Sequence, residues 1–420
     1  MSCDVLNTLE NLNTLLSIRL NLHEYDNIPL QFKDYTIKSG RVTFKVAGEF
    51  EIDLTIADED PEKQFWFIDL RFLFSPAVLE LPAHLRYYIE SRVNAALLTD
   101  GLPGCYKLLH EMVLTHKICE FRRQASELAR GKWVESLKIE ALNRAVSIQY
   151  WLDRYGAKGP KSWIVLGVHS GRRKDGRFDP KSTSHLFVRW FRDGKEVKDA
   201  DIKFDTVSLS AEALLKTVIA KHVAYILEAI HEKLQSKPLF AGNEMALEIT
   251  TSTDEPSESV LKVQVTSKQT ISVSIEPITG RFIVGPGSLH NMRAEYGFNS
   301  KSTDPANDGH SYIEQLRCDT AADEITTHGL SVGWIRIRRP DLKADDLKQV
   351  LPKDTLQVAW FRRPGWRKEW FIAVSLSMGG DRWWLIETYF RPLLCVSLRL
   401  TTLVLAPLCP ILVDRTSLQS

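Results

Sequence analysis

His110, Glu111 and His116 are the first candidates for metal chemistry in this sequence. A zinc-binding helix of the metalloprotease type places its two histidines four residues apart, so that both imidazoles lie on one helix face. His110 and His116 are six residues apart, which excludes that motif. Closely spaced pairs of the zinc-binding kind are also missing among the 6 cysteines, which are Cys3, Cys105, Cys119, Cys318, Cys395 and Cys409. We therefore expect neither a metal nor a cofactor.

Catalytic motifs of other kinds are equally weak. The acidic run from Asp58 to Glu62 could hold a general acid/base pair, but such a loop is usually a solvated turn. Gly285-Pro286-Gly287 lacks the third glycine and the following helix that a dinucleotide-binding turn requires. The sequence contains no G-x-S-x-G elbow, and nothing in it places a nucleophile beside a base. It predicts a protein that is not an enzyme.

Two arginine-rich loops give the strongest remaining chemical signal. They mix cations, which hold phosphates, with tryptophan, which stacks on bases. Their candidate residues are Arg172, Arg173, Arg177, Arg362, Arg363, Trp366 and Arg367. The net charge of +1 supplies no long-range attraction to nucleic acid. Because arginine and tryptophan are also enriched in protein interfaces, we favour protein contact and keep a sequence-tolerant nucleic-acid-binding module as the alternative.

The elements that would carry these residues begin with a predicted unit over 25–155. Val42, Phe44 and Val46 alternate with polar residues, as do the apolar residues of 50–56, and a third strand follows over 65–72. Three amphipathic helices are predicted next: one from Pro82, one after the break at Gly101, and one across Val134 to Leu152. Residues 1–24 read as an N-terminal helix remnant.

Sheet and helix then recur along the chain. The patterns predict a strand–helix module over 161–240, a four-strand meander with short helices over 241–328, and a third, truncated sheet over 329–387. Residues 388–420 form an apolar tail, and its uncharged run from Leu400 to Val413, which contains Pro407 and Pro410, is too short to span a membrane, so no membrane contact is expected. The predicted class is α+β, built from repeated small antiparallel β-meanders plus helices in an elongated arrangement.

Repeated small modules suit a protein that contacts several partners along its length. Aromatic and arginine side chains are the usual anchors of such contacts. We predict partner-interface residues in the first module at Trp66, Phe72, Tyr87, Tyr88, Arg122, Arg123 and Trp133.

Several segments also resemble a known family. They are Leu22 to Pro29, Tyr35 to Phe44, Phe65 to Phe74, Leu85 to Glu90, Gly101 to His110 and Ile118 to Ala125. In order and number they resemble the fungal form of the Mediator of RNA polymerase II transcription subunit 14 family, as a central fragment over Leu22 to Glu387. The tail over 388–420 lies outside the resemblance.

That resemblance implies a non-enzymatic scaffold in the nucleus, whose partners are other Mediator subunits. It would join the head and middle modules, and possibly the tail module, and would relay activators indirectly to RNA polymerase II. No catalytic residue carries over from the family. The family binds the tail module through a C-terminal portion that this sequence lacks, so that contact is the least expected.

Overall fold

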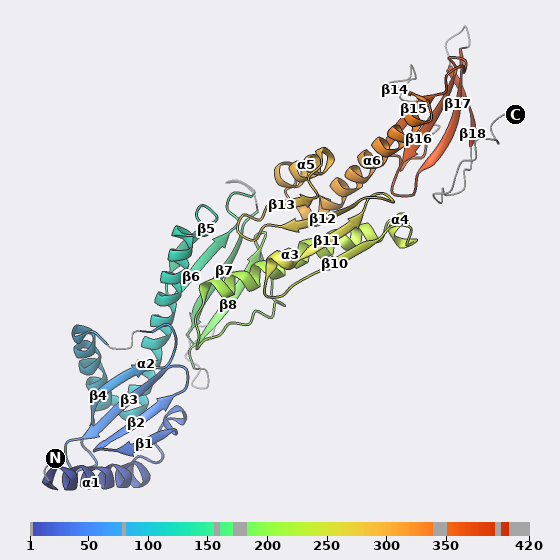
Figure 1. Ribbon diagram of the computed structural model, residues 1–420. Coiled ribbons are helices and arrows are strands. Elements are labelled where there is room, and N and C mark those ends of the chain that lie inside the picture. Colours follow the sequence, from blue (N-terminus) through green and yellow to red (C-terminus); the bar gives the residue numbers. More distant parts are fainter. Residues whose placement is uncertain are drawn as a thin grey trace. The chain divides into compact units, whose positions relative to one another are not determined.

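The computed structural model describes residues 3–77, 81–154, 160–170, 183–338, 351–390 and 396–402. The chain divides into two compact units, Met1–Val218 and Ile219–Ser420. Each unit contains two antiparallel sheets whose strands follow one another in sequence order (Figure 1). Every sheet is thus a meander accompanied by helices, which confirms the predicted α+β class and the recurrence of sheet and helix.

The described elements of the first unit are, in chain order, α1 (Cys3–Ile18), the helical turns η1 (Arg19–His23) and η2 (Leu30–Phe32), β1 (Tyr35–Lys38), β2 (Arg41–Val46), β3 (Phe50–Ile56), β4 (Phe65–Phe72), α2 (Ala83–Arg130), β5 (Leu137–Leu142), β6 (Ala145–Tyr150), β7 (Ser162–His169), β8 (His185–Arg192) and β9 (Lys195–Glu196). Helix α3 (Ala211–Gln235) crosses the sequence boundary between the two units.

One face of the first sheet is buried. Val42, Phe44 and Ile52 are fully buried, and the polar residues that alternate with them lie on the opposite face. Helix α1 and the first half of α2 lie against this sheet (Figure 1). Phe32 from the turn η2 stacks on Phe44, with ring centroids 4.6 Å apart. This core joins the N-terminal helix, the sheet and α2 into one body.

Helix α2 combines two of the predicted helices. Ile89, Val93 and Leu97, spaced by four, are buried in the core as the periodicity predicts. The predicted break is a kink at Gly101, whose φ of 63° and ψ of −149° lie outside the helical region. A positive φ strains any residue with a Cβ, so glycine at this position lets the chain change direction and then resume as a helix.

The predicted third helix over Val134 to Leu152 is wrong. That stretch is the hairpin β5–β6, with Ile139 paired to Ile148 and a turn at Arg144, whose φ is 52°. A spacing of four, as from Leu137 to Ala141, fits a period of two as well as a helical period, and the turn at Arg144 lets the alternation begin again in the next strand. Ile148 pairs in turn with Ile164 of β7. Pairing with a strand that comes later in the chain decided the conformation, which local periodicity leaves ambiguous.

The described elements of the second unit are α4 (Pro238–Ala241), β10 (Leu247–Thr250), the turn η3 (Pro256–Glu258), β11 (Val260–Gln264), β12 (Thr270–Ile275), β13 (Phe282–Gly285), α5 (Leu289–Tyr296), the turn η4 (Gly297–Lys301), α6 (Pro305–Ser331), β14 (Ile335–Ile337), β15 (Gln357–Arg362), β16 (Trp370–Leu376), β17 (Arg382–Phe390) and β18 (Val396–Thr402). The four strands predicted for 241–328 are confirmed as β10 to β13.

Helix α6 packs on one face of the last sheet. Cys318, Ala321 and Ala322 meet Phe361 and Val374 in a buried cluster. Arg317, which is 2% exposed, donates from Nη1 to the Ser377 carbonyl (2.9 Å) and pairs with Asp381 (2.8 Å). A charge-assisted hydrogen bond and an ion pair therefore also attach the helix to the segment around Ser377 and Asp381. The tail predicted over 388–420 does not hold as a whole, because β18 pairs with β17 along Trp384 to Phe390.

Substitution of Phe44 with alanine should destabilise the first unit by about 3–5 kcal/mol, because the change removes a fully buried ring that stacks on Phe32. Hydrogen exchange of β2 and β3 under mild denaturant would measure the loss. Tyr87→Ala is the matched control, because that ring is 75% exposed and its removal should leave protection within about 0.5 kcal/mol of wild type. Equal protection in Phe44→Ala and wild type would contradict the packing described.

Candidate partner-binding surface

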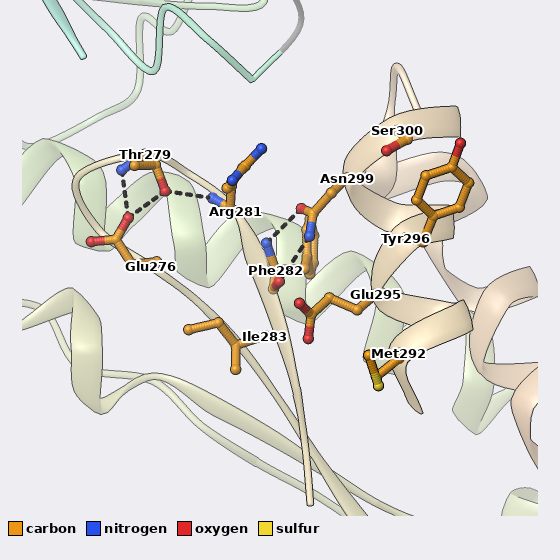
Figure 2. A pocket seen from close by; sticks show the side chains of 10 residues that line it. All are labelled: Glu276, Thr279, Arg281, Phe282, Ile283, Met292, Glu295, Tyr296, Asn299 and Ser300. Carbon is orange, nitrogen blue, oxygen red and sulfur yellow. Dashed lines mark hydrogen bonds between the residues drawn. The ribbon is translucent and has the colours of Figure 1, made fainter. Parts of the chain in front are cut away.

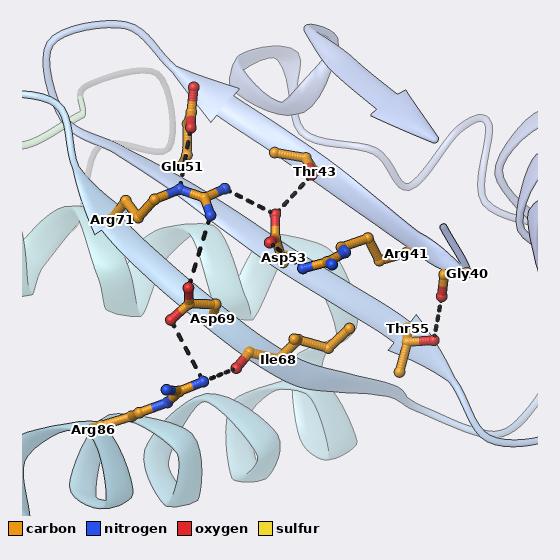
Figure 3. A network of polar contacts seen from close by, with 10 residues as sticks. All are labelled: Gly40, Arg41, Thr43, Glu51, Asp53, Thr55, Ile68, Asp69, Arg71 and Arg86. Carbon is orange, nitrogen blue, oxygen red and sulfur yellow. Dashed lines mark hydrogen bonds and ion pairs between the residues drawn. The ribbon is translucent and has the colours of Figure 1, made fainter. Parts of the chain in front are cut away.

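The outward face of the first sheet carries a network of charged side chains centred on Asp53 of β3 (Figure 3). Asp53 is only 2% exposed, yet its carboxylate accepts hydrogen bonds from Thr43 Oγ1 (2.6 Å), Arg41 Nη1 (3.1 Å) and Arg71 Nη2 (3.2 Å). A buried charge is tolerated when its hydrogen-bonding capacity is filled in this way. The strand register shifts between Asp53 and Leu54, at the centre of the network.

The same network ties helix α2 to the edge of the sheet. Arg71 also approaches Glu51 (3.4 Å) and Asp69 (3.7 Å), and Asp69 lies 3.6 Å from Arg86 of α2. Arg86 in addition donates to the Ile68 carbonyl at 2.9 Å. Charges fixed by several partners lose little entropy when another surface meets them, so this face is preorganised for contact.

Three of the predicted interface residues present exposed rings close to that network in the fold. Trp66 on β4 is 43% exposed and pairs with Thr55 on the polar face of the sheet. Tyr87 and Tyr88, on the first turns of α2 beside Arg86, are 75% and 56% exposed. Rigid aromatic side chains that keep water contact are the residue types on which protein interfaces depend most.

The other residues predicted for this interface differ in their exposure and in their contacts. Trp133 is only 3% exposed, so its ring is a core group and cannot anchor a partner; that prediction is wrong. Phe72 is half-buried and stacks on His116, with centroids 5.1 Å apart. Arg122 is exposed, whereas Arg123 forms ion pairs with Glu120 and Glu127 along its own helix.

Of the two basic and aromatic loops, the one that the structure describes does not present its predicted groups together. Arg172, Arg173 and Arg177 lie outside the described residues. In the other loop, Arg362 donates to the Lys368 carbonyl (2.9 Å) and its guanidinium lies 4.7 Å from the centroid of the Phe371 ring. Trp366 is half-buried against the core cluster beneath α6, whereas Arg363 and Arg367 are exposed. A base-stacking platform would need the indole ring on the surface beside the cations.

His110 and Glu111, the candidate metal ligands of the sequence, instead form polar contacts that connect helix α2 to other segments of the first unit; we call this set of contacts the joint. His110 Nδ1 lies 2.7 Å from Glu49 Oε2, and Nε2 lies 2.8 Å from the Ser184 carbonyl oxygen. Both of those oxygens accept hydrogen bonds, so only the imidazolium satisfies both contacts. Burial lowers the pKa of His110, but the hydrogen bond to the Glu49 carboxylate and its charge prevail, and the pKa lies above its usual 6.5.

Neighbouring charges on α2 complete this joint. Glu111 accepts from Ser184 Oγ (2.5 Å) and pairs with Arg144; these contacts outweigh burial and lower its pKa. Lys117, 3% exposed, donates from Nζ to the carbonyls of Gly48 (2.8 Å) and Thr206 (2.7 Å), and burial lowers its pKa. These charges hold α2 against both sheets of the first unit, and their hydrogen bonds are directed at the protein itself. The sequence showed the residue types but gave no sign of these partners.

No metal site is present among the described residues: no three or more histidine, cysteine, aspartate or glutamate side chains there converge closely enough to hold an ion. Among the helices that the structure describes, none has the length and apolar character that crossing a bilayer requires.

Comparison with known proteins gave consistent matches. A profile described as the fungal Med14 domain matches residues 230–325, and one described as Mediator complex subunit MED14 matches residues 2–58. The Mediator of RNA polymerase II transcription subunit 14 of Neurospora crassa is 47% identical over 392 residues, which cover 90% of this chain and 31% of the relative. Its counterpart from Pyricularia oryzae is 48% identical over 389 residues, covering 91% and 35%. The chain spans about a third of the length of these relatives.

The joint at His110 should make stability depend on pH. Because the folded-state pKa is raised, the stabilisation is complete below the unfolded value near 6.5 and is lost as pH rises through the folded value. We expect His110→Gln to lower the unfolding midpoint more at about pH 6 than at about pH 9, measured by chemical denaturation.

His116→Gln is the control on the same helix. Burial lowers the pKa of His116, so removal of this side chain should reduce the free energy of unfolding less at low pH than at high pH, which is the opposite trend. If His110→Gln lowers the unfolding midpoint equally at both pH values, His110 is not held as the imidazolium.

Proposed function

The chain belongs to the family of Mediator of RNA polymerase II transcription subunit 14, and on that premise we propose that it acts as a non-enzymatic scaffold subunit of the Mediator coactivator complex in the nucleus. In this role it links the head and middle modules of the complex and relays regulatory signals to RNA polymerase II. The observation that carries the proposal is the identity of 47% along 90% of the chain to a protein of that name.

The first unit supports a scaffold role through the surface that it offers. Trp66, Tyr87 and Tyr88 expose aromatic rings on elements whose positions are fixed by buried contacts and by the Asp53 network. A scaffold that keeps several proteins in register requires surfaces that do not rearrange on binding, since ordering costs affinity. We assign the meander β1–β4 and the first turns of α2 to contact with a partner subunit.

The hydrogen-bonded charges also support a role without catalysis. The buried or half-buried ionisable groups described above, His110, Glu111 and Lys117, form a joint between elements of the first unit. A catalytic acid or base needs hydrogen-bond reach to a bound substrate, and these groups direct theirs to the protein itself.

Direct nucleic-acid binding is the alternative, and the described part of the chain supports it less well. Arg363 and Arg367 are exposed cations, but Trp366 packs against a core cluster rather than standing beside them on the surface. If this alternative held, Arg363→Gln with Arg367→Gln would weaken binding to single-stranded DNA and reduce its steep dependence on salt.

Affinity purification of the tagged chain from nuclear extract of a filamentous fungus should recover Mediator subunits, identified by mass spectrometry. Tyr87→Ala combined with Tyr88→Ala should lower that recovery about tenfold, because these rings are exposed and available as anchors. Recovery of no Mediator subunit by the unaltered chain would refute the scaffold proposal.

Ile335→Ala is the matched control, since Ile335 is also an exposed large apolar residue (53%) but lies on β14 in the other unit. Its recovery of subunits should equal that of the unaltered chain. If the two tyrosine changes and the control reduce recovery equally, the first turns of α2 are not the contact surface.

A further inference from the structure

The outer face of the N-terminal helix changes from polar to apolar near its end. Along α1, the residues at helical spacing on this face are polar and uncharged: Asn7, Asn11 and Thr14. The same spacing continues into and past the turn η1 with Ile18, Leu22 and Tyr25, which are 44%, 73% and 73% exposed. We call these three residues the η1 face. Large apolar side chains on one side of a helix normally enter a core, and three that stay exposed together mark a surface for contact with another molecule.

The η1 face is held in place from below. Leu16, on the inner side of α1, is fully buried in the core of the first sheet. The turn η1 is a π turn in which the Glu24 amide donates to the Arg19 carbonyl (3.0 Å), and this i to i+5 geometry brings the side chains of the same two residues within 3.3 Å. Arg19 is 7% exposed and also lies 4.1 Å from the centroid of the Phe65 ring. Exposure of the face is therefore not a consequence of a loosely held helix.

Arg19 also determines what lies beside the face. Its Nη2 contacts the Glu24 carboxylate (3.3 Å) and donates to the Lys63 carbonyl (2.6 Å), so the loop between β3 and β4 lies next to η1. This loop carries four exposed carboxylates, those of Asp58, Glu59, Asp60 and Glu62. Asp26, which follows Tyr25, is exposed as well. Acidic side chains from two segments therefore border the η1 face.

Acids outnumber cations when every charged residue of these segments is counted. Residues 5–34 and 57–64 form the N-terminal helix, its continuation and the acidic loop, and they contain eight acids and three cations. The acids are Glu10, Glu24, Asp26, Asp34, Asp58, Glu59, Asp60 and Glu62. The cations are Arg19, Lys33 and Lys63.

Neighbouring elements do not restore the balance. The β1–β2 turn and helix α2 up to residue 107 add the cations Lys38, Arg92 and Lys107 and the acids Glu90 and Asp100, which brings the count to ten acids and six cations. The other charges of the sheet and of this part of α2 match one another in number: Arg41, Lys45, Arg71 and Arg86 with Glu49, Glu51, Asp53 and Asp69. The excess of negative charge around the first sheet therefore belongs to the segments that border the η1 face.

The cations closest to the face are already engaged. Arg19 pairs with Glu24, and Lys63 pairs with Asp58. Four acids form no ion pair with any residue that the structure describes: Asp26, Glu59, Asp60 and Glu62. Asp60 accepts from the Glu62 amide (3.0 Å), but a backbone hydrogen bond leaves the charge of the carboxylate in place. An apolar face bordered by carboxylates of this kind is complementary to an apolar segment bordered by cations.

We propose that the η1 face docks a basic amphipathic helix of another protein, whose apolar side chains cover Ile18, Leu22 and Tyr25 and whose lysine or arginine side chains meet Asp26 and the β3–β4 loop. A second copy of this chain fits less well, because a symmetric contact would place acidic loop near acidic loop. The site uses residues other than those assigned above to a partner subunit. It does not rest on the scaffold role, since the purified chain should show the complementarity on its own.

Fluorescence anisotropy of the full chain with labelled synthetic peptides would test the site. One peptide carries leucine at i, i+3, i+4 and i+7 and lysine elsewhere; a second has glutamate in place of lysine, and a third has serine in place of leucine. We expect the first peptide to bind with micromolar affinity that weakens as salt is added. The glutamate and serine counterparts should each bind at least about tenfold more weakly, because each lacks one of the two complementary features.

Variants separate the two parts of the site. Leu22→Ser with Tyr25→Ser should weaken binding of the basic peptide about tenfold, and Glu59→Gln with Glu62→Gln should reduce its salt dependence. Two controls should change neither: Leu142→Ser, which alters a leucine 50% exposed on β5 of the same unit, and Glu248→Gln with Glu258→Gln, which alters exposed acids of the other unit. Because all these side chains are exposed, circular dichroism should show unaltered folding.

Equal affinity for the lysine and glutamate peptides, equal affinity for the leucine and serine peptides, or absence of binding would overturn the proposal. So would an affinity that the Leu22 and Tyr25 changes leave intact. Self-association of the free chain in sedimentation, lost on the same two changes, would show that a second copy covers the face instead. None of these outcomes bears on recovery of Mediator subunits from extract, so this proposal and the scaffold proposal can fail separately.

Discussion

A single long helix, α2, supplies the core of two sheets, and the organisation of the first unit depends on that sharing. Its first half buries Ile89, Val93 and Leu97 against β1–β4, while its second half lies against β5, β6 and β7. An element packed on both sides cannot shift toward one sheet without opening the other. Between the two contacts, His110 and Lys117 donate to carboxylate and carbonyl oxygens, and Glu111 accepts from Ser184 and Arg144, so the position of the helix is set by directional bonds as well as by burial.

Because α2 and the sheets have fixed positions, the side chains on their outward surfaces can be specific for one partner. Asp53 is buried with three donors on the polar face of the first sheet, which keeps Arg41 and Arg71 in fixed places, and Trp66 is exposed on the same face. Helix α5 follows the same rule in the second unit. Ser288 caps its start and Asn299 binds the backbone of Phe282 (Figure 2), while Leu289, Met292 and Tyr296 on its outer side are exposed. In both units rigidity comes from buried polar contacts, and the exposed aromatic or apolar groups remain available to partners.

The charges beside Trp66 are already paired with one another. A partner that met this face would therefore gain mainly from burial of aromatic rings, and less from new ion pairs.

The sequence by itself determined the class of the fold, the strands β2 to β4, the four strands β10 to β13, the stripe of α2 and the family, because each depends on local alternation, helical spacing or the order of motifs. Tertiary structure alone decided that 137–150 is a hairpin, that β18 joins the last sheet and that Trp133 is a core residue. Those outcomes depend on pairing and packing between segments, which the pattern within one segment does not show. The partners of His110 and the exposure of Leu289, Met292 and Tyr296 were hidden for the same reason: residue types are written in the sequence, but which of them face each other and which face water is fixed only when the segments pack together.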